Sequence, residues 1–180
     1  MTAADTPVLL LPGRGNSDAQ HWQSLWEAEH PNFHRVLQDE WEHPDCATWR
    51  QRLEAAVAAR GPGTVLAAHS LGCLLAAHWA AQSHGRVRAA LLVGVPDPSR
   101  PTFPPELTGF APLPMQPLPF ASIVVASTND PYGRWEHSRD CAAAWGSRLV
   151  TIGAAGHINT ASGFGPWPQG LALLEELIGR

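Results

Sequence analysis

The sequence has no lysine and little charge, and we attribute the missing lysine to genome bias and not to function. Its 12 basic residues are all arginine, against 16 acidic residues, which gives a formal net charge of −4. No basic cluster of the kind that binds nucleic acid is present, so we expect no nucleic-acid partner. Charged residues make up 16% and hydrophobic residues 44% of the 180 residues. This composition is typical of a globular protein and not of a disordered one.

Long hydrophobic runs and patterned cysteines are also missing. No apolar run approaches transmembrane length, and residues 1–5 lack the basic start of a signal peptide. The cysteines and early histidines have no metal-type spacing. These residues are Cys46, Cys73, Cys141, His30, His34 and His43. We therefore expect a cytoplasmic protein with reduced thiols, no metal and no membrane contact.

Short apolar runs alternate with segments of helical periodicity along the whole chain. Continuous apolar runs are typical of strands buried on both faces of a parallel sheet. The predicted strands lie at residues 7–12, 33–37, 65–67, 87–93, 120–126 and 148–152. The pattern predicts a single α/β domain over residues 1–180, a three-layer sandwich with a mostly parallel sheet of about six strands.

Capping residues and prolines set the limits of the segments between these strands. Ser17 or Asp18 is predicted to cap the first helix, and Asp45 the second. Nine prolines lie between residues 94 and 119, which excludes a long regular helix there. No segment is long enough for a helical cap domain. We interpret the proline-rich segment, residues 97–119, as a wall or partial lid of the active site.

A strand pattern passes directly into a helical pattern at His69-Ser70-Leu71-Gly72. A serine at such a turn is the setting of the nucleophile elbow, usually written G-x-S-x-G. Ala68 stands where that motif has its first glycine, and alanine still meets the need for a small residue. The motif predicts Ser70 as a nucleophile and the Leu71 amide as an oxyanion donor. His69 should point away from Ser70, in a structural or pocket-lining role.

A nucleophilic serine needs a base and an orienting acid, and both follow later strands. Asp130 and His157 each come directly after a predicted strand, where active sites of parallel sheets lie. The chain order Ser, Asp, His is that of the α/β-hydrolases. Asp97 remains an alternative acid, because it follows the strand before and some lipases place the acid there.

The glycine-rich turn after the first strand is expected to supply the second oxyanion donor. We favour the Arg14 amide, with Gly15 or Asn16 as neighbouring alternatives. A dinucleotide site is not expected, because Asp18 stands where G-x-G-x-x-G needs its third glycine. The candidate pocket residues are Gly13, Gly15, Asn16, His21, Trp22 and His69.

Five short motifs occur in an order that resembles a known family. They are Leu11-Pro12-Gly13-Arg14-Gly15, His21-Trp22 with Trp26, Ala67 to Gly72, Ser127 to Tyr132, and Gly156-His157. With them the chain resembles the small serine hydrolases of the retinoblastoma-binding protein 9 type. The resemblance implies a minimal α/β-hydrolase fold without a cap domain and a Ser-Asp-His triad. It also implies hydrolysis of ester, amide or thioester bonds, and it fixes no natural substrate.

The leading hypothesis is an esterase-like serine hydrolase that acts on a small acyl compound through Ser70, His157 and Asp130, without a cofactor. One alternative is a binding or scaffold protein that keeps the fold with little catalysis. Another is an acyltransferase or perhydrolase that uses the same triad with a different acceptor. Either a monomer or a small homo-oligomer is compatible with the sequence.

Overall fold

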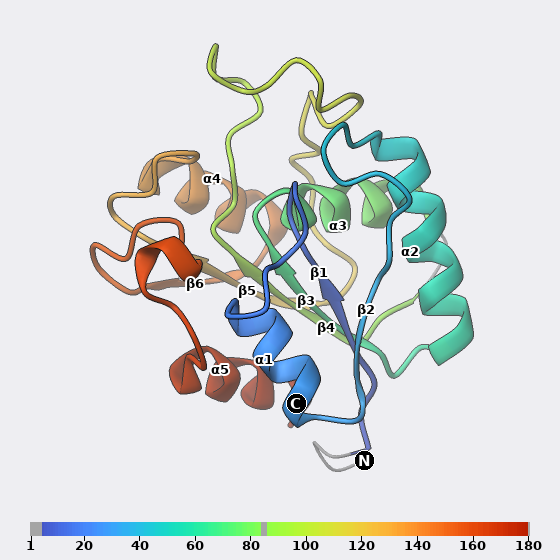
Figure 1. Ribbon diagram of the computed structural model, residues 1–180. Helices are drawn as coiled ribbons and strands as arrows, with labels where there is room; N and C mark the ends of the chain where they lie inside the picture. The colour runs from blue at the N-terminus through green and yellow to red at the C-terminus, as the bar shows by residue number, and fades with distance from the viewer. Residues whose placement is uncertain (1–4, 84–85, 180) are drawn as a thin grey trace.

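A parallel sheet forms the centre of the computed structural model, which describes residues 5–83 and 86–179 (Figure 1). The strands of this described part are β1 (Val8–Leu11), β2 (Phe33–Arg35), β3 (Val65–His69), β4 (Ala89–Val93), β5 (Ala121–Ala126) and β6 (Arg148–Thr151). They lie in the order β2-β1-β3-β4-β5-β6, and each neighbouring pair is parallel. The predicted sheet is confirmed, and all of its pairings are parallel.

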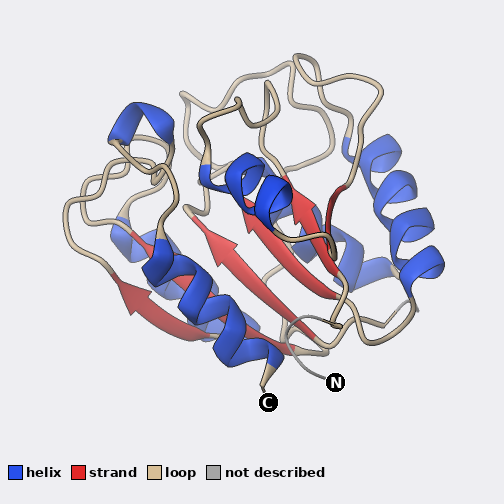
Figure 2. Ribbon diagram, turned by 60° about the horizontal axis from the view of Figure 1, so that its bottom comes forward, coloured by secondary structure: helices blue, strands red, loops and turns tan. Residues whose placement is uncertain are grey.

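Helices cover both faces of this sheet, as Figure 2 shows. In the described residues they are α1 (Trp22–Glu29), α2 (Cys46–Arg60), α3 (Leu71–Gln82), α4 (Trp135–Trp145), α5 (Pro168–Ile178) and the short 3-10 helix η1 (Thr160–Ser162). Residues of α2, α3 and α4 form one core cluster with the sheet, and residues of α1 and α5 form the other. The three-layer arrangement predicted from the alternating pattern is confirmed. None of these helices is long and apolar enough to span a bilayer.

The central strands are buried on both faces, which explains their continuous apolar sequences. Leu9 and Leu11 belong to the core cluster under α2, α3 and α4, whereas Val8 and Leu10 belong to the cluster under α1 and α5. Each such buried side chain contributes about 1.5–3 kcal/mol to folding. The sheet is therefore a rigid base for the residues at its carboxyl edge.

The first helix begins later than the sequence indicated. Its N-cap is His21, whose Nδ1 accepts a hydrogen bond from the Gln23 amide at 3.2 Å. Asp18 instead accepts hydrogen bonds from the Gln20 amide and the Thr160 hydroxyl. The prediction of a cap at Ser17 or Asp18 is wrong because the chain first makes a turn, in which the His21 amide donates to the Asp18 carbonyl at 3.1 Å, and α1 begins only after it. The predicted cap Asp45 is confirmed, with its Oδ1 2.8 Å from the Thr48 amide.

The proline-rich segment runs outside the sheet, in green to yellow at the top of Figure 1, and contains no helix or strand in the described chain. Its Thr108 carbonyl accepts from the Cys46 amide at 2.9 Å. Its Pro114 carbonyl accepts from Trp145 Nε1 at 2.8 Å. The segment is therefore fixed onto α2 and α4.

Candidate active site

Ser70 lies in a sharp turn between β3 and α3. Its backbone has φ of 54° and ψ of −124°, a conformation that costs a non-glycine residue free energy and clusters at functional sites. Two hydrogen bonds hold the turn: the Ser70 amide donates to the Val93 carbonyl at 3.0 Å, and the Cys73 amide donates to the Ser70 carbonyl at 2.8 Å. The turn places Ser70 beyond the carboxyl end of β3, as the elbow motif predicted.

Small residues around this turn let the strands and the helix approach closely. A Cβ on Gly72 would lie 2.2 Å from the Leu11 carbonyl oxygen, and a Cβ on Gly13 would lie 2.9 Å from Ser70 Cβ. Ala68 pairs with Leu11 in the sheet and is fully buried. Position 68, the first glycine of the consensus motif, therefore accommodates a methyl group here, whereas position 72, the second glycine, does not.

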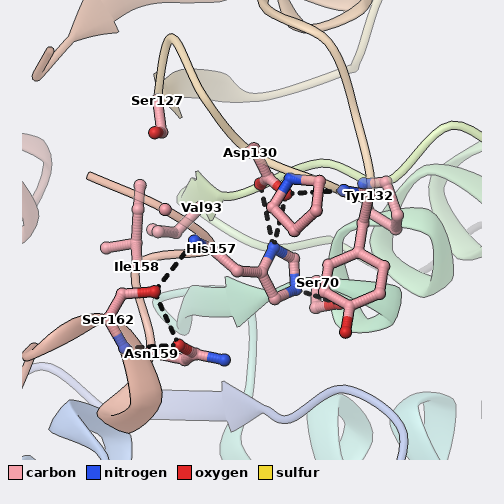
Figure 3. A network of polar contacts seen from close by, with 12 residues as sticks. Ser70, Val93, Ser127, Asp130, Tyr132, His157, Ile158, Asn159 and Ser162 are labelled. Atoms are coloured by element: carbon pink, nitrogen blue, oxygen red, sulfur yellow. Dashed lines mark hydrogen bonds and ion pairs between the residues drawn. The ribbon is translucent and has the colours of Figure 1, made fainter. Parts of the chain in front are cut away.

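The side chains of Ser70, His157 and Asp130 form a continuous hydrogen-bonded relay (Figure 3). His157 Nε2 lies 2.8 Å from Ser70 Oγ, and His157 Nδ1 lies 2.8 and 3.0 Å from the two Asp130 oxygens. A carboxylate accepts hydrogen bonds, so the imidazole proton lies on Nδ1. The lone pair on Nε2 is thereby free to accept the Ser70 hydroxyl proton. These residues are the three that the sequence predicted as nucleophile, base and acid.

Asp130 is held in place by the residues around its carboxylate. The Tyr132 amide donates to Asp130 Oδ1 at 2.9 Å. Gly94 lies beside both residues: a Cβ there would be in van der Waals contact with Asp130 Oδ2 at 3.4 Å and with the His157 ring at 3.5 Å. Only 2% of the Asp130 side chain is exposed. This burial protects its contact with His157 from competing water.

The loop that carries His157 is fixed on both sides of that residue. The His157 amide donates to Ser162 Oγ at 3.1 Å, and Ser162 Oγ donates to Asn159 Oδ1 at 2.9 Å. On the other side, His69 Nε2–H donates to the His157 carbonyl at 2.8 Å. His69 thus points toward the backbone of the His157 loop, and its ring also lines the cleft.

The alternative acid Asp97 has other partners. Its Oδ1 accepts hydrogen bonds from the Ser99 amide and hydroxyl at 2.9 and 2.6 Å, and it lies 3.8 Å from His137 Nδ1. His157 is paired with Asp130 instead. The structure therefore brings Asp130, and not Asp97, to the imidazole of His157.

The backbone amides of Leu71 and Arg14, two residues that line the cleft with Ser70, have no hydrogen-bond acceptor in the described part of the chain. The neighbouring amides are occupied: Gly15 donates to the Trp41 carbonyl, and Asn16 donates to the Gly13 carbonyl. Unsatisfied amides beside a nucleophile are the donors that an oxyanion needs.

The Arg14 side chain joins two of the segments around Ser70. Its guanidinium lies 2.9 Å from the Glu106 carboxylate, an ion pair between the β1–α1 loop and the proline-rich segment. Both side chains are about one-third exposed, so the pair contributes little to stability.

A cleft of about 300 Å³ opens at Ser70. Of the residues that the sequence placed in the pocket or the oxyanion hole, several do line it. These are Arg14, Asn16, His21, His69 and Leu71. Trp22 does not, because its ring is fully buried and its Nε1 donates to the Ile158 carbonyl at 3.0 Å. Gly13 lies against Ser70, and Gly15 is turned toward Trp41, so neither glycine lines the cleft.

Sequence reasoning did not single out several residues that line the cleft, among them Tyr132 and Asn159. Tyr132 carried a usable signal, since it follows Asp130 by two residues and had to lie near the same strand end. Phe103 lies in the proline-rich segment that the sequence predicted as a wall of the site, and it does line the cleft, but no local pattern distinguished it from the other residues of that segment.

Two buried histidines beside the site are held neutral. Burial lowers the pKa of His21 to about 4, even though Asp18 acts in the opposite direction. Burial likewise lowers the pKa of His69 well below its usual value, and the neighbouring His157 and His21 add to this effect. Because His21 Nδ1 accepts from the Gln23 amide, the proton of the neutral ring lies on Nε2.

The cysteines and histidines within residues 5–83 and 86–179 are not assembled for metal binding. No group of three or more potential ligands is arranged around a common point in the residues that the structure describes. The cysteines are buried and free, and burial raises the pKa of Cys73, which lies in α3 near Ser70. A neutral, buried thiol is a poor nucleophile, so Ser70 is the reactive group that this geometry favours.

An all-parallel sheet between helical layers, with a serine elbow and a buried Asp–His pair at its carboxyl edge, places the chain among the α/β-hydrolases. More narrowly, the chain belongs to the serine hydrolase family, whose model matches residues 8–176. None of the curated proteins matches the sequence.

Solved structures agree with this assignment. A YdeN-like hydrolase from Pectobacterium atrosepticum is 35% identical, with a TM-score of 0.86 over 96% of this chain and 90% of that one. The ydeN gene product of B. subtilis is 21% identical, with a TM-score of 0.79 over 97% of this chain and 100% of that one. A thermophilic esterase from Thermogutta terrifontis shares the fold at 17% identity and a TM-score of 0.70, over 98% and 90% of the two chains.

Proposed function

We propose that the protein hydrolyses small carboxylic esters, and amides or thioesters of similar size, through an acyl-enzyme formed on Ser70. The observation that carries the proposal is the relay in which His157 Nε2 lies 2.8 Å from Ser70 Oγ and Nδ1 lies 2.8 Å from Asp130. Membership of the serine hydrolase family supports the same reaction class. As part of this proposal, we assign the protein to the retinoblastoma-binding protein 9 type within that family.

In the proposed first step, Ser70 Oγ attacks the substrate carbonyl carbon while His157 Nε2 takes the hydroxyl proton. Asp130 keeps the imidazole in the required tautomer and stabilises the positive charge that the ring gains. The negative charge that develops on the carbonyl oxygen is stabilised by the Leu71 and Arg14 amides. Loss of one such donor raises the barrier by about 3–4 kcal/mol.

In the following steps the same histidine returns the proton. His157 protonates the leaving oxygen, nitrogen or sulfur, the bond to the acyl carbon breaks, and the first product departs. Water then gives a proton to His157 and attacks the acyl-enzyme, and Ser70 Oγ takes that proton back as the carboxylic acid is released. The chemistry needs no cofactor. Acyl transfer or perhydrolysis would follow the same course with another acceptor in place of water.

Turnover of p-nitrophenyl acetate tests this proposal. We expect Ser70→Ala to lower kcat/KM at least about a thousandfold, because the variant has no nucleophile. Ser99→Ala is the matched control: it removes a serine hydroxyl close to the cleft that takes no part in the relay, and it should retain turnover. Activity that persists in folded Ser70→Ala would refute the proposal. A folded wild-type protein that turns over no ester would favour the binding or scaffold alternative.

A further inference from the structure

Tyr132 is a large side chain at the mouth of the cleft that the proposed chemistry does not use. It lines the cleft beside Ser70 and His157, and 57% of it is exposed. We propose that its ring forms a binding site for an aromatic leaving group, so that the preferred substrates are esters of aromatic or arylmethyl alcohols. This inference deepens the proposed hydrolase function and depends on it.

The ring of Tyr132 lies against the imidazole of His157, as Figure 3 shows. The two ring centroids are 4.5 Å apart, with an angle of 60° between the planes. On another side of the imidazole lies the buried His69 ring, with a centroid distance of 4.8 Å. His157 is thus flanked by one buried ring and one exposed ring. Both rings line the cleft, but only 5% of His69 is exposed, so Tyr132 offers a ligand the larger surface.

The reaction itself decides which part of the substrate lies beside Tyr132. His157 must deliver its proton to the leaving oxygen, which therefore comes within hydrogen-bond reach of Nε2. The group attached to that oxygen leaves the reaction centre past the imidazole. An aromatic ring there can pack against Tyr132 in the offset or edge-to-face geometry that aromatic pairs prefer.

Other apolar residues extend this surface. Pro96, Phe103 and Leu107 line the same cleft. The Asp97 amide donates to the Tyr132 carbonyl at 3.0 Å, which joins the Tyr132 loop to the segment that carries these residues. With Pro104 they make most of this side of the cleft apolar, although Asp97 and Thr102 of the same segment also line it.

A second set of cleft residues is polar. It contains Asp18, His21 and Thr160, and the Thr160 hydroxyl donates to Asp18 Oδ1 at 3.0 Å. An aromatic group would gain little binding free energy from contact with these polar residues. The difference between the two sets favours the Tyr132 side for the ring of the substrate.

The hydrogen bonds of Tyr132 indicate that its ring, and not its hydroxyl, is the group that contacts a ligand. The hydroxyl has no hydrogen-bond partner among the residues described in the structure, whereas the Tyr132 amide and carbonyl are both bonded. The loop is therefore held by its backbone, and the side chain stays free to contact a ligand. Replacement of the ring should change binding without disturbing the Asp130 carboxylate.

Three esters of similar intrinsic reactivity test this inference: ethyl acetate, benzyl acetate and ethyl phenylacetate. We expect the wild-type protein to prefer benzyl acetate over ethyl acetate by about tenfold in kcat/KM. Tyr132→Ala should remove most of this preference, and Tyr132→Phe should keep it. Leu37→Ala, which truncates an exposed apolar residue outside the cleft, is the matched control and should leave the ratio unchanged.

The ratio of kcat/KM for benzyl acetate to kcat/KM for ethyl acetate distinguishes a binding role of Tyr132 from a structural one. If Tyr132 only shielded His157, Tyr132→Ala would slow both acetates equally, and the unchanged ratio would overturn the inference. A preference for ethyl phenylacetate that depends on Tyr132 would also overturn it, because the ring would then bind the acyl side. If the wild-type protein hydrolysed none of the three esters, the proposed function itself would fail.

Discussion

At the scale of single residues, the proposed mechanism assigns the direction of proton transfer to the contact between Asp130 and His157. Asp130 fixes the proton of His157 on Nδ1, and this leaves Nε2 as the base toward Ser70. An asparagine in place of Asp130 can stabilise the opposite tautomer, in which Nε2 carries the proton and cannot act as a base. The acid therefore contributes through orientation and charge without any movement of its own.

This role predicts that substitution of Asp130 lowers kcat far more than substitution of Asp97. Asp130→Asn should lower kcat for p-nitrophenyl acetate about ten-thousandfold with little change in fold. Asp97→Asn should change kcat less than about threefold, because Asp97 is bonded to Ser99. Steady-state kinetics, with circular dichroism as a folding control, measure both effects. The opposite order would move the acid to Asp97.

Single residues were predictable from the sequence where local chemistry determined them. Ser70, Asp130 and His157 each follow an apolar strand, so their meeting at one edge of the sheet follows from parallel topology. The expected cleft position of Trp22 did not follow, since its burial depends on Trp26 and Trp167 packing around it. Contacts between distant segments leave no local pattern.

At the scale of elements, the approach of α3 to β1 determines whether the elbow can form. Gly72→Ala would place a methyl group 2.2 Å from the Leu11 carbonyl oxygen, so the helix would have to move away from the strand. We expect the free energy of unfolding to fall by about 3 kcal/mol or more, as for severe overpacking. Urea denaturation measures the change.

Gly146→Ala is the matched control for this substitution. Gly146 ends α4 in the left-handed region, and a Cβ there would have no other atom within 4 Å, so only backbone strain of about 1 kcal/mol is expected. Equal losses at the two positions would contradict the steric explanation. The central strands of the sheet were predictable because burial on both faces leaves continuous apolar runs. The start of α1 was not, because the loop before it bonds to Thr160, far away in the sequence.

At the scale of the whole molecule, the buried neutral histidines make stability depend on pH. The folded pKa of His21, about 4, lies below its ordinary value of 6.5, and that of His69 is lowered as well. At a pH between the folded and the ordinary pKa of each histidine, the unfolded chain binds a proton that the folded protein does not. Stability is therefore present above the ordinary pKa and falls as the pH is lowered toward the folded pKa, by about 1.4 kcal/mol per pH unit for each such group.

Urea denaturation between about pH 7 and about pH 4.5 tests this dependence. His21→Asn removes the titrating ring but keeps a side-chain acceptor for the Gln23 amide, so α1 retains its cap. We expect the variant to show a shallower loss of stability on acidification than the wild-type protein. His43→Asn, at an exposed position, is the control. An unchanged slope in His21→Asn would show that His21 does not contribute.

The central claim is that Ser70 is a nucleophile activated by His157. The most direct measurement is the reaction of the whole protein with a fluorophosphonate, followed by peptide mapping in a mass spectrometer. The account predicts one label per chain, on Ser70, and labelling slowed at least about a thousandfold in His157→Gln. A label on any other residue, or a folded wild-type protein that does not react, would contradict it.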